Sequence, residues 1–251
     1  MTIGDGWRKP ASYAQLGVPV ATALAGGRPG LPAALIAVAV VTLYLAGQAT
    51  LVRLGHRGEL ARHHRGPRAG RSARALGAVG LIAGLVGVVL GGDRVAWAVV
   101  AAAAPVVVVG VLGLWRREAT TAGQAMTASA IAGGSLPVAI ASRFDPADAW
   151  LCWFTWSMAF TATICAGRYA LARGQGRVAR GEAVAVALVG FLTGCLAAAG
   201  LDLSPAALPM LAVAVGLVVR PTELTHLRTI GWAVAAATLA SGLWMVVVLR
   251  G

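Results

Sequence analysis

The chain has 251 residues, of which 58% are hydrophobic and 12% are charged, and its formal net charge is +12. A water-soluble domain carries charge on about a quarter of its residues, so this composition excludes an ordinary soluble domain. Nucleic acid is also excluded as a partner, because the basic residues lie only between apolar runs and form no folded basic face.

Nine apolar runs follow one another along the chain, and most are long enough to cross the ~30 Å hydrocarbon core of a bilayer as helices. They cover residues 11–27, 31–53, 75–92, 95–115, 119–142, 149–169, 182–201, 205–219 and 229–249. The first and the eighth are short. Pro105 and Pro137 fall inside two of these segments and should kink them. The sequence therefore predicts an all-α fold, a polytopic transmembrane helix bundle of about nine spans that forms a single domain over residues 1–251.

The basic residues are divided unequally between alternate connections. With the N-terminus in the cytoplasm, 17 of the 21 Lys and Arg residues fall on the cytoplasmic side. The four on the other side are Arg28, Arg94, Arg143 and Arg250. Because basic connections are retained in the cytoplasm, this distribution predicts a cytoplasmic N-terminus and an outside C-terminus in the bacterial cytoplasmic membrane.

The segment between the second and third predicted spans is the most basic part of the chain. Residues 52–74 contain seven arginines, three histidines and one glutamate. We interpret this segment as a cytoplasmic loop whose charge sets the orientation of the protein. Its expected partners are membrane lipids with anionic headgroups. Arg53, at the edge of the second span, is its first candidate for a ligand contact.

Glycines recur at intervals of three and four residues on the third predicted span, and a shorter pair occurs on the seventh. Such rows let a neighbouring backbone approach closely inside a membrane, so both rows are predicted to be packing faces. The residues are Gly77, Gly80, Gly84, Gly87 and Gly91, with Gly190 and Gly194 on the seventh span.

Residue types that usually form catalytic or metal sites are sparse and dispersed. The three cysteines lie in apolar runs without C-x-x-C spacing, and His63 and His64 are adjacent, so on a helix they point to different faces. No carboxylate falls deep within a predicted span. Asp145 and Asp148 share a short exterior connection, where we interpret them as solvated. The sequence therefore predicts no catalytic residue, no metal and no cofactor, and leaves open whether the protein is an enzyme.

Two predicted spans carry polar side chains on one face. On the fifth, Thr120, Gln124, Thr127 and Ser135 share a face; on the sixth, Ser157, Thr161 and Arg168 do. One interpretation is ordinary hydrogen bonding between helices. The other is a cavity that opens to the cytoplasm through a rim of arginines. Its candidate ligand-binding residues are Arg53, Arg116, Arg117, Thr120, Gln124, Ser157, Thr161, Arg168 and Arg220.

Three stretches of the chain resemble the YwiC-like family of bacterial integral membrane proteins. Residues 9–19, KPASYAQLGVP, are similar to the opening helix of that family, which typically begins P-x-E-H-G-A-W; Tyr13 stands here in place of the tryptophan. The other stretches are RRE at 116–118, followed by a small and polar helix, and RP at 220–221, followed by LR and GW at 227–228 and 231–232. The resemblance covers nearly the whole chain and implies a multi-span membrane protein, but it brings no activity with it.

The expected architecture is also similar to that of the UbiA-type intramembrane prenyltransferases, which have enlarged cytoplasmic loops after their second and sixth helices. Those enzymes hold magnesium and a prenyl diphosphate through aspartate-rich motifs in these two loops. In this chain the corresponding segments, 53–74 and 168–181, contain Glu59 as their only carboxylate. Hard cations need several oxygen ligands, so the standard metal-dependent reaction is excluded.

Three hypotheses about function remain open. The first is binding or transport of an amphipathic anionic molecule at the cytoplasmic arginine rim. The second is a divergent UbiA-type transferase without the aspartate-rich motifs. The third is a structural subunit of a membrane complex, which its partners contact through the glycine rows.

Overall fold

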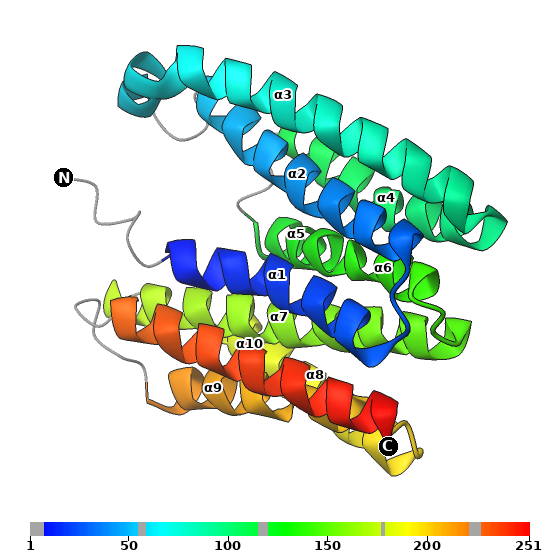
Figure 1. Ribbon diagram of the computed structural model, residues 1–251. Coiled ribbons are helices and arrows are strands. Elements are labelled where there is room, and N and C mark those ends of the chain that lie inside the picture. Colours follow the sequence, from blue (N-terminus) through cyan, green and yellow to red (C-terminus); the bar gives the residue numbers. More distant parts are fainter. Residues whose placement is uncertain (1–7, 55–58, 115–119, 177–178, 221–226) are drawn as a thin grey trace.

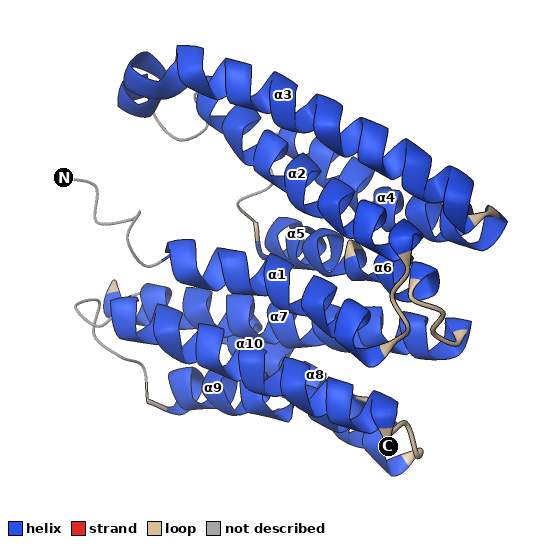
Figure 2. Ribbon diagram, in the orientation of Figure 1, coloured by secondary structure: helices blue, strands red, loops and turns tan. Residues whose placement is uncertain are grey.

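The computed structural model describes residues 8–54, 59–114, 120–176, 179–220 and 227–251, and throughout these residues the regular structure is helical (Figures 1 and 2). The elements are α1 (Arg8–Gly26), α2 (Leu31–Arg53), α3 (Glu59–Gly91), α4 (Asp93–Leu114), α5 (Thr121–Gly133), α6 (Ser135–Ala141), α7 (Pro146–Gly174), α8 (Arg180–Ala198), the 3-10 turn η1 (Ser204–Ala207), α9 (Leu208–Val219) and α10 (Leu227–Arg250). The predicted all-α bundle is confirmed. Six of the helices, α2, α3, α4, α7, α8 and α10, are long and apolar enough to cross a membrane.

The other three predicted spans fall on shorter or less apolar elements. The first lies within α1, and the eighth is divided between η1 and the twelve-residue α9. The fifth is interrupted at Gly134, where α5 ends and α6 begins. Pro137 explains this interruption, because it has no N–H to donate to the carbonyl of Gly133. The helix is therefore interrupted shortly before Pro137, where a kink was expected, whereas α4 is one continuous helix through Pro105.

The basic segment before the third span was predicted to be a loop, and this prediction is wrong from Glu59 onward. There α3 begins, and it continues for 33 residues to Gly91. At ~1.5 Å per residue it is about 50 Å long, which exceeds the ~30 Å hydrocarbon core. The prediction failed because charge was taken as the sign of a loop. Arginine, alanine, leucine and glutamate all favour helix.

Successive passes of the chain alternate in direction, with α5 and α6 forming one pass and η1 and α9 another, so their termini gather at two ends of the bundle (Figure 1). At one end α1, α5 and α8 begin and α2, α7 and α9 end. We call it the basic end, because Arg53, Arg168, Arg173, Arg180 and Arg220 belong to it. At the other end α1, α3, α6 and α10 end and α2, α4 and α7 begin. We call it the distal end.

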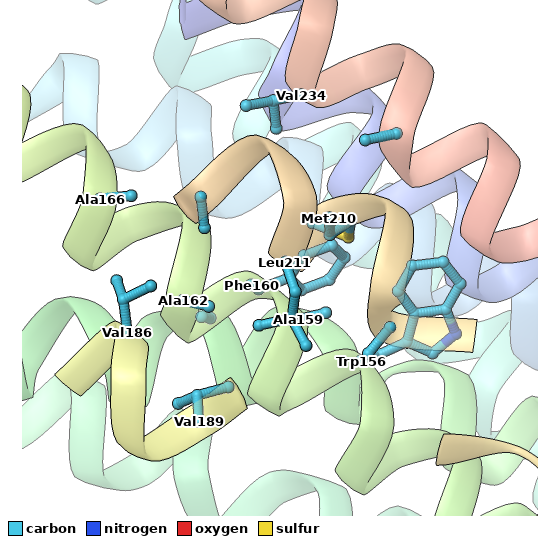
Figure 3. Close-up of a cluster of buried hydrophobic side chains, with 14 of the residues drawn as sticks. Trp156, Ala159, Phe160, Ala162, Ala166, Val186, Val189, Met210, Leu211 and Val234 are labelled. Atoms are coloured by element: carbon cyan, nitrogen blue, oxygen red, sulfur yellow. The ribbon is translucent and has the colours of Figure 1, made fainter. Parts of the chain in front are cut away.

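Helix α7 is the centre of the larger core. Its Trp156 and Phe160 are fully buried and stack with their ring centroids 5.4 Å apart. Met210 of α9, Val186 of α8 and Val234 of α10 belong to the same buried cluster (Figure 3). A second cluster joins α1, α2, α4 and α6 and the start of α7. Helix α7 therefore fixes the positions of the helices that carry the candidate site.

The outer faces of the peripheral helices are apolar. Leu81, Leu85 and Val89 on α3 and Leu188 and Phe191 on α8 are exposed. Exposed apolar faces of this extent are costly in water and are stable against lipid tails. The exposed surface therefore fits the multi-span character of the helices.

The glycine row on α3 packs as predicted over its central part. A Cβ atom on Gly80 would lie 2.7 Å from Leu43 Cγ, and one on Gly87 would lie 2.9 Å from Ile36 Cδ1, both on α2. Gly84 also faces α2, whereas Gly91 packs against Val95 of α4 and Gly77 meets open space. The close approach of α2 and α3 therefore depends on these glycines.

The second glycine row was predicted to be a packing face, but within the described part of the chain it packs against no other helix. Gly190 and Gly194 have no neighbour within 4 Å of the position a Cβ atom would take. Helix α8 instead turns Val186, Val189 and Thr193 inward. These larger side chains, and not the glycines, make its contact with the core.

Candidate functional site

A carboxylate at the basic end joins three helices. Glu182 lies in the first turn of α8, and its Oε1 accepts a hydrogen bond of 3.2 Å from Thr121 Oγ1 at the start of α5. The same oxygen lies 3.8 Å from Nε of Arg168, in the last two turns of α7. The two charged side chains are 20% and 32% exposed, so water screens the pair only in part. We call Thr121, Arg168 and Glu182 the Glu182 cluster.

The position of Glu182 also suits the helix that carries it. A negative charge in the first turn interacts favourably with the partial positive charge at a helix N-terminus. Arg168 approaches from the C-terminal part of α7, where a positive charge is favoured for the same reason. The two helix dipoles and the ion pair therefore all stabilise these positions of Glu182 and Arg168.

Two of the predicted ligand-binding residues lie beside this cluster on α5. Thr120 caps the helix, since its Oγ1 accepts a hydrogen bond of 3.1 Å from the backbone N–H of Gly123. Gln124 is half-buried one turn further along, and its backbone N–H donates to the carbonyl of Thr120. The structure therefore brings Thr120, Gln124 and Arg168 to one end of the α5–α7 contact.

Two more predicted residues lie further along the same contact. Ser157 Oγ of α7 donates to Ser129 Oγ of α5 across 3.4 Å, and Trp153 Nε1 donates to the Ser129 carbonyl across 3.0 Å. Thr161 Oγ1 donates to the carbonyl of Ser157, 2.7 Å away in its own helix. Hydrogen bonds between and within helices thus account for these polar side chains.

The remaining rim residues are more dispersed. Arg53 is exposed at the end of α2, and its side chain packs over Gly70 of α3, where a Cβ atom would lie 3.3 Å from Arg53 Cδ. Arg220 is exposed immediately after α9. Arg116 and Arg117 lie outside the described residues. The described members of the predicted rim therefore do not all lie at one point. Thr120, Gln124 and Arg168 do lie together.

Sequence reasoning missed the role of Glu182. Like the other carboxylates, it was noted only as lying outside the interior of the predicted spans. A usable signal was present, because Arg168 lies at the end of one predicted span and Glu182 begins the next. Antiparallel neighbours of this kind bring such residues together.

Two adjoining cavities lie at the distal end, away from the predicted rim. The first has a volume of about 600 Å³ and is lined by Gly26, Gly27, Arg28, Arg143, Phe144, Asp145, Asp148, Leu249 and Arg250. The second, of about 370 Å³, is lined by Pro32, Leu90, Gly91, Arg94, Val95, Ile140, Ala141, Arg143, Phe144 and Pro146. Arg143 and Phe144 form the wall between them. We call these the distal cavities.

Metal ligands do not cluster in the part of the chain that the structure describes: no three His, Cys, Asp or Glu side chains there are placed to hold one ion. The described polar groups of the Glu182 cluster and its neighbours are hydroxyls, the amide of Gln124, the carboxylate of Glu182 and the guanidinium of Arg168. This set can bind an anion or a hydroxylated group.

The fold and its surface define a multi-span helical membrane protein. Within that class, the chain belongs to the YwiC-like protein family, whose family model matches residues 11–140, from α1 to α6. No curated protein and no solved structure matches the chain. The similarity to UbiA-type prenyltransferases therefore has no support from these comparisons.

Proposed function

We propose that this YwiC-like protein binds or moves an amphipathic anionic molecule at the basic end, between α5, α7 and α8. The observation that carries the proposal is the position of Arg168. Its guanidinium lies at the end of the polar α5–α7 contact and is only partly exposed. Its Nε lies 3.8 Å from Glu182 Oε1, so the guanidinium already interacts with an anionic oxygen. A phosphate or carboxylate of a ligand has the same chemistry as this partner and suits the same guanidinium.

We further propose nine crossings, with the basic end in the cytoplasm of a bacterial cell. The 17 to 4 division of basic residues supports this orientation. The anionic lipids of the cytoplasmic leaflet would then surround the basic end. They are the nearest source of a ligand with the proposed chemistry.

The proposal can be tested with the purified full chain in detergent and with vesicles of phosphatidylglycerol as the probe. Arg168→Gln should weaken binding, since it removes the charge that attracts the headgroup. A double variant, Arg168→Gln with Glu182→Gln, avoids leaving an unpaired carboxylate. Arg173→Gln, exposed in the last turn of the same helix, is the matched control. Unchanged binding in a correctly folded double variant would contradict the proposal.

One observation favours a second candidate, the role of a subunit in a membrane complex. Gly190 and Gly194 leave a shallow strip on the outer face of α8, and small residues in such a strip allow a second helix to approach. Leucine at both positions should then abolish co-purification of a membrane partner in mild detergent. Vesicle binding at Arg168 should be unaffected.

A further inference from the structure

The described basic residues of the distal end converge on one place. Arg28 follows α1, Arg94 is the second residue of α4, Arg143 follows α6 and Arg250 ends α10. Arg28, Arg143 and Arg250 line the larger of the two adjoining cavities, and Arg94 and Arg143 line the smaller. Arginines placed only for solubility or orientation have no reason to meet, because each acts on its own connection. Their convergence therefore indicates a shared use.

Specific contacts hold the wall of the larger cavity in place. The backbone N–H of Arg28 donates to the carbonyl of Ser142 across 2.8 Å, and Nε of Arg250 donates to the carbonyl of Ala25 across 2.7 Å. Gly27 allows the close approach, since a Cβ atom there would lie 2.5 Å from the Ser142 carbonyl oxygen. Three segments that are distant in sequence are thus fixed against each other around the cavity.

Arg143 occupies a backbone conformation that favours glycine. Its φ is +64°, in the left-handed region, where a side chain is disfavoured and glycine is not. It also forms part of the wall between the two cavities. An unfavourable conformation at a cavity wall is a recognised mark of a functional position. The backbone conformation at this position would favour glycine, so the reason for an arginine here must lie in its side chain.

The larger cavity carries both signs of charge. Arg28, Arg143 and Arg250 line it together with Asp145 and Asp148. Among the described residues, none of these arginines forms an ion pair within 4.0 Å with either aspartate. A simple anion would meet the two carboxylates, and a simple cation would meet the arginines. A ligand that carries both charges complements the cavity better than either.

We infer that the larger distal cavity binds a zwitterion that joins a phosphate to a primary ammonium group, as in ethanolamine phosphate. The phosphate contacts Arg28 and Arg143, which as guanidinium groups donate hydrogen bonds in a planar fork. The ammonium contacts Asp148 and the free oxygen of Asp145, whose Oδ1 already accepts from the N–H of Ala147. Two sources share this chemistry, a lipid headgroup and a free small molecule. The inference does not depend on the function proposed for the basic end.

Binding to the full-length protein in detergent tests the inference, with two forms of the same group as probes. One is ethanolamine phosphate in solution, and the other is vesicles of phosphatidylethanolamine. Binding of the vesicles alone identifies a lipid headgroup, and binding of the soluble compound identifies a free molecule; either supports the inference. Binding of neither, or equal binding to phosphatidylcholine vesicles, whose ammonium group is not primary, overturns it.

Two substitutions separate the two charges. Arg143→Gly removes a guanidinium while suiting the backbone, and it should weaken binding of the zwitterion about tenfold. Asp148→Asn should weaken binding of the zwitterion but not that of phosphatidylglycerol. Asp202→Asn, an exposed aspartate that lines neither cavity, is the control and should bind as the unmodified chain does. Unmodified affinity in both Arg143→Gly and Asp148→Asn overturns the inference.

Discussion

The two ends of this bundle use arginine in different ways. At the basic end the arginines are numerous, and those described do not gather around one point: Arg53 packs on α3, Arg220 follows α9, and among the described arginines only Arg168 pairs with a carboxylate across helices. At the distal end there are four, and all of them line two adjoining cavities. Many charges set the orientation of a membrane protein without forming a site. A few charges that converge can form one.

The largest effect is expected where the distal end is packed most tightly. Gly27→Val should lower the free energy of unfolding by about 3 kcal/mol, because its side chain would collide with the Ser142 carbonyl and the Phe144 ring. Thermal unfolding in detergent measures this loss. Gly77→Ala, in the middle of α3 with no neighbour within 4 Å, should be neutral or stabilising. Equal melting temperatures for the two variants would show that the approach at Gly27 is not rigid.

At the basic end the corresponding effect should be smaller. Glu182→Ala removes the acceptor of Thr121 and the partner of Arg168, and we expect a loss of about 1 kcal/mol. A double-mutant cycle with Arg168→Ala should give a coupling energy of roughly 0.5 kcal/mol, because the pair is partly exposed and 3.8 Å apart. A coupling energy near zero would mean that the two charges do not interact in solution.

The same substitution should have opposite signs at the two ends. Arg143→Gly should raise the free energy of unfolding by about 0.5 to 1 kcal/mol, since it relieves a left-handed backbone. Arg173→Gly, in the last turn of α7, should lower it by a similar amount, since glycine is a poor helix former. Chemical denaturation of both variants under identical conditions measures the difference. A loss of stability in Arg143→Gly would mean that the guanidinium makes contacts that outweigh the backbone cost.

The smallest effect is expected for an isolated arginine of the basic end. Arg180→Gln, exposed at the first residue of α8, should change the free energy of unfolding by less than about 0.5 kcal/mol. Chemical denaturation of this variant measures the change. A larger loss would show that the basic end is held together by more charges than Glu182 and Arg168.

The sequence predicted the helices well and the sites poorly, and the reason is distance along the chain. Apolar length and proline position are local properties, so the spans and the interruption before Pro137 could be foreseen. The course of α3 was missed because a basic helix and a basic loop have similar compositions. Gly190 and Gly194 have the spacing of a packing face, but spacing alone does not tell which side of α8 meets the core.

The two candidate sites also differ in how far apart their residues lie along the chain. The polar face of α5 and the position of Arg168 could be read from residue spacing within single helices. The distal cavities could not, because Arg28, Arg143 and Arg250 are separated by most of the chain. Only the packing of α1, α7 and α10 brings them together. From the sequence, the four arginines on the side opposite the basic segments served only to predict the orientation of the chain. In the structure they are the arginines that line the distal cavities.

The length of α3 has a consequence for how deeply the protein sits in the bilayer. From Arg74 to the end of the helix at Gly91 the distance is about 26 Å, close to the thickness of the hydrocarbon core. Arg68, Arg71 and Arg74 are exposed and, at intervals of three residues, lie within one sector of about 120° around the axis. If the helix moved along its axis toward its distal end, Arg74 would be the first of the three to enter the lipid tails. Because the glycines of α3 pack tightly against α2, the depth of α3 in the bilayer also sets the depth of α2. The same packing sets the level of the distal cavities relative to the lipid headgroups.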